Sequence, residues 1–292
     1  MRGQQAGTEQ GEAVLAQALA AYQAALGSRL VAAYALGSLA HGGFSPLVSD
    51  VDLGLILRDP LWIQHRLTIR AVARAVRADG SALHRRLSVF WGTPATLAGR
   101  ARGGRFPPLD RLDLLEYGRL LTGQDVRHGV ARPGQEELLV AGAEFALGYL
   151  GAARNLPGLL RDRVRPGSHD RDTLDDIRHP ERLVSHGPRR MTKTVLFPVR
   201  FLFTAATGRV GSNVLAAEHY LASAGAPAAE LVAAAVAWRL EPPAGETATA
   251  LLRRELIPLY VYYLDDHVAR LSVAGRPALA DRFRRCRARL LA

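Results

Sequence analysis

The first part of the chain alternates short apolar runs with longer segments in which apolar residues recur at helical spacing. Leu30–Leu36 and Val51–Leu57 are apolar, of strand length, and bounded by turn residues. Residues 87–91 form a third run of this kind. Helical composition or spacing marks residues 10–26 and 60–79. The pattern therefore predicts a small sheet whose strands are separated by helices.

The following segment closes a first domain. Residues 99–108 hold three glycines and two prolines and are predicted to be a loop. Residues 109–121 have helical spacing and are predicted to form one helix before Thr122 and Gly123. We expect the first domain to span residues 1–125, with an α/β (α+β) fold built on a small mixed sheet.

From about residue 135 the pattern predicts one helix after another, with breaks at Pro157, 166–188, Gly208 and 241–245. The last segment places Leu279, Phe283, Cys286 and Leu290 on one helical face, which is typical of a helix that packs on a bundle. Residues 135–292 are thus predicted to form an all-α helical-bundle domain.

Composition restricts the classes of partner. The formal net charge is +11, and Lys193 is the only lysine, so the excess is almost entirely arginine. Many arginines alternate with acids, as in Arg161–Asp162–Arg163, a pattern typical of a solvated surface. This pattern disfavours nucleic acid as a partner and favours small polyanions such as nucleoside triphosphates.

Other features bear on the compartment. Cys286 is the only cysteine, so the chain can form no intrachain disulfide and no cysteine-based metal site. The apolar stretches are shorter than the roughly 20 residues that a membrane helix needs. Glu9 and Glu12 interrupt the apolar run that a secretory signal would require. We expect a cytoplasmic protein without membrane association.

The chemistry is concentrated between Tyr34 and Leu57. Side chains alternate along a strand, so Asp50 and Asp52 point to the same face, with carbons roughly 6 to 7 Å apart. Two such carboxylates repel each other unless a cation lies between them, and their oxygens suit Mg²⁺ bridged to the phosphates of a nucleotide. Gly37 allows a close backbone approach, and Ser38 adds a hydroxyl and an amide for a phosphate.

Two further residues are candidates for nucleotide binding. Ser49 precedes the acids, and its hydroxyl is expected to bond the adjacent backbone or the triphosphate. Lys193 is expected either to reach a phosphate from the helical domain or to be an ordinary solvated lysine.

Gly37-Ser38, eleven intervening residues and then Asp50-x-Asp52 at the start of an apolar strand resemble the signature of the nucleotidyltransferase superfamily. The chain is most similar in pattern to two-domain aminoglycoside adenylyltransferases of the streptomycin/spectinomycin type. Residues 120–125 resemble the segment that closes the catalytic domain in many members, and residues 200–208 and 216–218 resemble their helical domain.

The resemblance implies that residues 1–125 are the catalytic domain and that residues 135–292 bind the substrate. It also implies that a nucleotide, usually ATP, binds with Mg²⁺ between the domains, and that a hydroxyl of a small molecule attacks the α-phosphorus as pyrophosphate leaves. Asp50 and Asp52 match the carboxylates that hold the metals, two ions in a fully active site.

The sequence also departs from the pattern. Ser88 stands where active members carry a third Asp or Glu on a neighbouring strand, and a neutral hydroxyl can neither offset a second metal nor accept a proton near neutral pH. Asn213 lies near the position of a nucleotide-contacting lysine. Glu144 could replace the missing base, but a solvated helix position explains it as well.

The remaining polar residues have simpler explanations. His41 lies in the Gly-Ser to Asp-x-Asp loop, where it could touch a nucleotide or be an ordinary loop residue. The acids of the predicted helix 109–121 are expected on its exposed side: Asp110, Asp113 and Glu116. Three histidines lie in the connection 166–188, which could be a linker or a lid, and their spacing does not match a zinc site: His169, His179 and His186.

Three functions are compatible with these residues. The first is transfer of a nucleoside monophosphate, AMP from ATP, to a hydroxyl of an aminoglycoside-like small molecule. The second is a binding or regulatory protein that keeps the fold and has lost catalysis with the acid at Ser88. The third is nucleotidylation of protein or RNA, as in toxin-antitoxin systems.

Overall fold

The computed structural model describes residues 2–78, 80–151 and 173–292. The chain divides into two compact units, Met1–Pro133 and Gly134–Ala292, each built around apolar clusters of its own. Within the described ranges, no helix has the length and the apolar composition needed to cross a membrane.

The first unit contains a small mixed sheet, as the sequence predicts, and this sheet has a fourth strand in addition to the three predicted ones. Its strands, in the order β3-β2-β1-β4, are β3 Leu87–Gly92, β2 Val51–Leu57, β1 Leu30–Leu36 and β4 Arg119–Gly123. The central strand β1 is antiparallel to both β2 and β4, whereas β2 and β3 are parallel.

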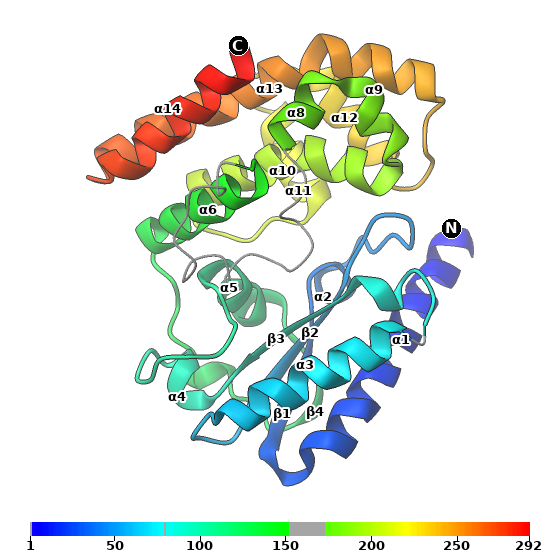
Figure 1. Ribbon diagram of the computed structural model, residues 1–292, viewed down its shortest axis with the longest axis vertical. Coiled ribbons are helices and arrows are strands. Elements are labelled where there is room, and N and C mark those ends of the chain that lie inside the picture. Colours follow the sequence, from blue (N-terminus) through cyan, green and yellow to red (C-terminus); the bar gives the residue numbers. More distant parts are fainter. Residues whose placement is uncertain (1, 79, 152–172) are drawn as a thin grey trace. The chain divides into compact units, whose positions relative to one another are not determined.

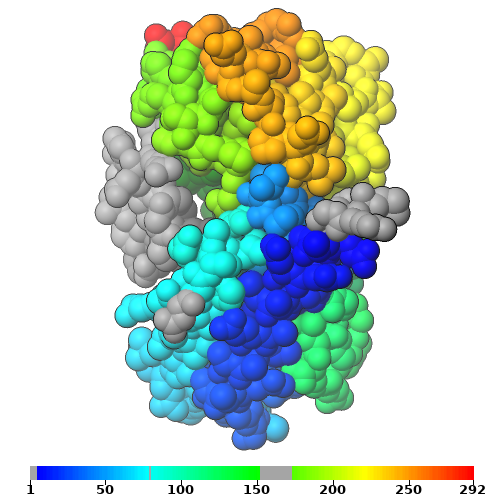
Figure 2. Space-filling model, turned by 90° about the vertical axis from the view of Figure 1, so that its right-hand side faces the viewer, coloured from blue at the N-terminus to red at the C-terminus, as the bar shows by residue number. Residues whose placement is uncertain are grey.

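One face of this sheet is covered by two long helices, α1 Arg2–Leu26 and α3 Ile63–Ala78 (Figure 1). Apolar residues at alternate positions of β2 point to this face and are buried, from Val51 to Leu57. Figure 2 shows α1, in dark blue, running across one side of the first unit. This face of the sheet is therefore a hydrophobic core.

The opposite face carries Asp52, Gly54 and Ile56 of β2. It is partly covered by α4 Pro94–Leu97 and α5 Pro108–Tyr117. Leu114 of α5 packs there with Leu36 of β1 and Ile56 of β2. Asp52 shares a side of β2 with Ile56, because the two are four positions apart on the strand. Asp52 consequently lies on the same side of the sheet as α5.

The prediction of one helix over residues 109–121 is wrong. Helix α5 ends at Tyr117, and a side chain at Gly118 would collide with the carbonyl oxygen of Leu114. The next residues form β4, in which Arg119 pairs with Ala35 of β1. Periodicity cannot separate a short strand from a helix end, and here pairing with a distant strand decides the conformation.

In its described residues, the second unit consists of helices around an apolar core, as the sequence predicts. These are α6 Gln135–Tyr149, α8 Thr173–Arg178, α9 Pro180–Ser185, α10 Pro188–Thr207, α11 Asn213–Leu221, α12 Ala229–Ala237, α13 Gly245–Val273 and α14 Pro277–Leu291. In α14 the predicted apolar face is confirmed, because Phe283, Cys286 and Leu290 are buried.

The connection 166–188 is not a plain linker in its described part. Residues 173–185 fold into α8 and α9, which contact α13 and α14 of the same unit. The predicted break at Pro157, the segment Arg161–Asp162–Arg163 and His169 lie outside the described residues. Short 3₁₀ helices complete the description: η1 Gly27–Arg29, η2 His84–Arg86 and η3 Arg127–Gly129.

Candidate functional site

The Gly-Ser turn follows directly from the central strand. Strand β1 ends at Leu36, and Gly37 then adopts φ +59° and ψ −145°, a conformation that only glycine reaches without strain. The short helix α2 Ser38–His41 follows, and the amides of Ala40 and His41 both donate to the carbonyl of Gly37, at 2.9 and 3.0 Å. The turn thus presents Ser38 at the end of the sheet.

Asp52 lies against this turn. It is paired with Leu36 in the antiparallel register of β1 and β2, which brings its side chain beside the residue that follows Leu36. A Cβ atom built on Gly37 would lie 2.5 Å from Oδ2 of Asp52. Gly37 is therefore required both by its backbone conformation and by the carboxylate that fills the space where a side chain would be.

Asp50 is held at the end of an ordered loop. It directly precedes β2 and is half-buried. The preceding Ser49 is buried, and its hydroxyl accepts a hydrogen bond from the amide of Ser45 at 3.0 Å. Arg86 donates to the carbonyl oxygens of Ser49 and Pro46, at 3.0 and 2.5 Å. The Ser49 hydroxyl thus bonds its own loop, which was one of its two expected roles.

Ser88 occupies the position next to Asp52 in the sheet. The parallel register pairs these two residues, so their side chains lie on the same face. Ser88 is buried, and its β3 neighbour on that face is Phe90. Strand β3 therefore brings a hydroxyl, and no carboxylate, to the side of Asp52.

A third carboxylate reaches the motif from a helix. Asp113 of α5 is buried, with 8% of its surface exposed, and its Oδ2 accepts a hydrogen bond of 2.7 Å from the amide of Gly37. The expectation that Asp113 lies on the exposed side of its helix is wrong. No local pattern marks this contact, because the partners are 76 positions apart and α5 buries Leu112 and Leu114 on either side.

The acidic residues alone do not form a metal cage. Across residues 2–78, 80–151 and 173–292, no group of three or more His, Cys, Asp or Glu side chains is arranged to hold a metal ion. An Mg²⁺ ion that binds together with a nucleotide needs fewer protein ligands, because it commonly takes one or two carboxylates and completes its shell with phosphate oxygens and water.

A second polar group ties the end of the first unit to β1. The buried hydroxyl of Tyr34 donates to Oδ1 of Asp125 at 2.9 Å and accepts from the amide of Val126 at 2.8 Å. Burial raises the pKa of Tyr34 to about 12. Hydrogen bonds from Arg127 hold the pKa of the Asp125 carboxyl well below its usual range. This group fixes the strand that leads into Gly37.

The other candidate site residues predicted from the sequence lie on four different helices. Lys193 is a half-buried residue of α10, Glu144 is exposed on α6, and Asn213 is the first residue of α11, all in the second unit. His41, in α2 of the first unit, contacts the ring of Tyr117 edge to face, with centroids 5.5 Å apart.

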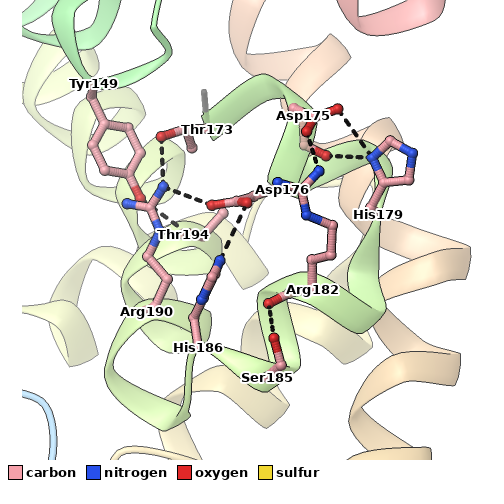
Figure 3. A network of polar contacts seen from close by, with 10 residues as sticks. All are labelled: Tyr149, Thr173, Asp175, Asp176, His179, Arg182, Ser185, His186, Arg190 and Thr194. Carbon is pink, nitrogen blue, oxygen red and sulfur yellow. Dashed lines mark hydrogen bonds and ion pairs between the residues drawn. The ribbon is translucent and has the colours of Figure 1, made fainter. Parts of the chain in front are cut away.

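Two histidines of the connection 166–188 belong to a polar network of the second unit (Figure 3). His186 lies 3.6 Å from the buried Asp176, which also accepts a hydrogen bond of 3.0 Å from Arg190. His179 lies 3.2 Å from Asp175. The guanidinium of Arg190 stacks over Tyr149, whose hydroxyl is 3.0 Å from that of Thr194. These histidines face carboxylates rather than a shared metal site.

Comparison with known proteins agrees with this description at the level of the fold. No protein-family model matches the sequence, and no curated protein matches it. The fold resembles that of a nucleotidyltransferase, with a small mixed sheet followed by a helical region.

A solved structure of this class is similar to most of the chain. It is the crystal structure of spectinomycin adenyltransferase AAD(9) from Enterococcus faecialis with ATP and spectinomycin. The likeness covers 84% of this chain and 98% of that chain, with a TM-score of 0.50 and 14% sequence identity. At this identity the likeness establishes the fold, and the chemistry has to be argued from the residues.

Proposed function

We propose that this protein is a Mg²⁺-dependent nucleotidyltransferase that moves AMP from ATP to a hydroxyl of a small, aminoglycoside-like molecule. In this proposal the first unit is the catalytic domain and the second unit binds the acceptor. The observation that carries it is the packing of Asp52 against Gly37, at the end of the strand that precedes the Gly-Ser turn. The neighbour AAD(9), which was crystallised with ATP and spectinomycin, supports the choice of substrates.

The residues of the candidate site have different roles in this proposal. Asp50 and Asp52 would hold Mg²⁺, which would neutralise the charge that develops on the triphosphate. Gly37 leaves room for Asp52, and Ser38 offers its hydroxyl and amide to a phosphate. An oxygen–phosphorus bond forms between the acceptor hydroxyl and the α-phosphorus, the bond to pyrophosphate breaks, and the hydroxyl proton leaves to solvent.

A second function is favoured by one observation, the buried Ser88 beside Asp52. A strand that offers a hydroxyl where a third carboxylate is expected would suit a protein that binds a nucleotide without transferring it. Such a protein would regulate a partner, with nucleotide binding as its signal.

Calorimetric titration with a non-hydrolysable ATP analogue, with and without Mg²⁺, is the first test. Metal-dependent binding is expected, and it would justify a screen of hydroxyl acceptors for AMP transfer. Binding without transfer to any acceptor would favour the regulatory function. Absence of binding to ATP and to other nucleoside triphosphates would contradict both.

The metal assignment is tested by Asp52→Asn. We expect a loss of Mg²⁺-dependent analogue binding of about 100-fold or more, because the neutral amide cannot replace an anionic ligand. Glu12→Gln is a matched control that removes a carboxylate from an exposed ion pair with Arg119 in the same unit. Unchanged binding in Asp52→Asn, with both variants folded, would exclude Asp52 as a metal ligand.

A further inference from the structure

The buried carboxylate of Asp113 has no counterpart in the Gly-Ser to Asp-x-Asp motif. It is carried by α5, which lies against β1, and the adjacent Leu112 and Leu114 are buried with it. Burying a carboxylate is costly unless hydrogen bonds compensate its lost hydration. The hydrogen-bond donor to Asp113 is the Gly37 amide in the Gly-Ser turn, so this contact connects Asp113 directly to the candidate site.

The contact with Gly37 has the geometry of a strong hydrogen bond. The distance of 2.7 Å from the Gly37 amide to Oδ2 of Asp113 lies in the range of charge-assisted bonds. The other side of Gly37 faces Oδ2 of Asp52. Two carboxylates from different elements thus meet at one glycine, one at its amide and the other at its α-carbon.

The backbone conformation of Gly37 requires stabilising contacts. Its backbone conformation is open to glycine alone, and such conformations persist only where the surroundings determine them. The carbonyl of Gly37 is fixed by the amides of Ala40 and His41, which belong to α2. Asp113 fixes the amide of the same residue, so both polar groups of Gly37 have a defined partner.

We propose that Asp113 is a positioning residue of the nucleotide site, whose carboxylate holds the Gly37 amide and so sets the Gly-Ser turn against Asp52. This inference rests on the proposed function, because it assigns Asp113 a role in nucleotide binding. The hydrogen bond between Asp113 and Gly37, however, is present in the protein without nucleotide. Asp113 acts through its hydrogen bond, which distinguishes it from a replacement for the acid absent at Ser88.

The first test measures hydrogen exchange of the Gly37 amide by NMR in the protein without nucleotide. The amide is expected to be protected in the wild-type protein and in Asp113→Asn, whose side-chain oxygen can still accept the bond. In Asp113→Ala, exchange should accelerate about 10- to 100-fold, the range expected for loss of a bond to a charged group. Unchanged exchange in Asp113→Ala would overturn the proposal.

The second test measures affinity for the ATP analogue with Mg²⁺. Asp113→Ala should weaken binding about 10-fold or more, and Asp113→Asn only about threefold, because a neutral acceptor makes a weaker bond. Asp110→Ala, one turn earlier on α5, is the matched control and should bind like the wild-type protein. Thermal unfolding of each variant verifies that it is folded.

The outcomes separate this inference from the proposed function. One result would contradict the positioning role. In that result, Asp113→Asn loses as much affinity as Asp113→Ala, and adding Ser88→Glu to Asp113→Asn restores binding. The negative charge of Asp113, and not its hydrogen bond, would then be what nucleotide binding requires. If the wild-type protein binds no nucleotide, the proposed function is wrong, and the hydrogen bond from Gly37 to Asp113 has no role in nucleotide binding. The exchange rates of Gly37 would still show whether that turn is held.

Discussion

The two units each bury a helical aspartate, and these two carboxylates accept hydrogen bonds from different kinds of donor. In the second unit, Asp176 has a side chain that is 3% exposed, and it accepts a hydrogen bond from Arg190 with His186 nearby. In the first unit, Asp113 accepts a hydrogen bond from the main-chain amide of Gly37. Asp176 thus accepts a hydrogen bond from a guanidinium, whereas Asp113 accepts one from the peptide of a turn that also contacts Asp52.

The difference separates a structural carboxylate from a candidate for function. Arg190 also donates to the hydroxyl of Thr173 at 2.7 Å and stacks over Tyr149, so Asp176 lies in a network that joins α6, α8 and α10 (Figure 3). Asp113 instead joins α5 to the loop that carries the Gly-Ser motif. Loss of the first should reduce stability, and loss of the second should change the geometry of the site.

The largest effect is expected from Asp176→Ala. Its removal leaves the guanidinium of Arg190, whose side chain is 20% exposed, without its carboxylate partner. The free energy of unfolding should fall by about 3 kcal/mol, as for other buried ion pairs that lose one partner. Denaturant unfolding monitored by circular dichroism measures this change.

The matched control is Asp175→Ala, at the preceding position of α8. Asp175 pairs with Arg182 at the surface, where both side chains are more than one third exposed. Its loss should cost less than about 1 kcal/mol, because exposed ion pairs contribute little. Equal losses in the two variants would mean that burial of Asp176 does not set its importance.

An intermediate effect is expected from Gly37→Ala in the first unit. The added methyl group would meet Asp52 at 2.5 Å, and φ of +59° would be strained as well. Affinity for the ATP analogue with Mg²⁺ should fall about 10-fold or more, and stability by about 1 to 2 kcal/mol. Isothermal titration and denaturant unfolding give the two quantities.

Gly42→Ala provides the comparison for Gly37→Ala. Gly42 also has a positive φ, of +88°, but nothing lies within 4 Å of the position that its Cβ would take. This variant should show the backbone strain, about 1 kcal/mol, without the loss of affinity. Equal losses of affinity would show that strain of the loop, rather than the contact with Asp52, controls binding.

The smallest effect is expected from Tyr34→Phe. This variant removes the hydroxyl that joins Asp125 and Val126, and should cost about 1 kcal/mol at neutral pH. The pKa of Tyr34 is raised by burial to about 12, whereas an unfolded tyrosine titrates near 10. The folded state therefore favours the protonated hydroxyl, and its contribution is complete below about pH 10 and lost as the pH rises towards 12.

Denaturant unfolding at several pH values tests this sign. The stability difference between the wild-type protein and Tyr34→Phe should shrink between pH 10 and 12. A difference that grows over this range would show that the folded state favours ionised Tyr34.

The sequence predicts much of the fold because several segments carry strong local patterns. Strands β1, β2 and β3 are apolar runs between turn residues, and the apolar face of α14 repeats at helical spacing. The Gly-Ser to Asp-x-Asp motif marks its own strands and turn, and the resemblance that it supports is confirmed at the level of the fold.

Other elements have weak local patterns. Strand β4 continues the helical spacing of α5, and its conformation depends on pairing with β1. Helices α8 and α9 contain short apolar stretches among charged residues, and they form against α13 and α14. In each case a distant partner supplies the energy that local propensity lacks.

By itself, the sequence determined the order of strands and helices in the motif and the absence of a carboxylate at Ser88, because apolar runs, turn residues and residue identities are local properties. Only the tertiary structure decided that Ser88 lies beside Asp52 and that Asp113 holds Gly37. The reason is physical: a hydrogen bond across 76 positions forms only when sheet and helix have packed, and nothing in the spacing of either segment records it.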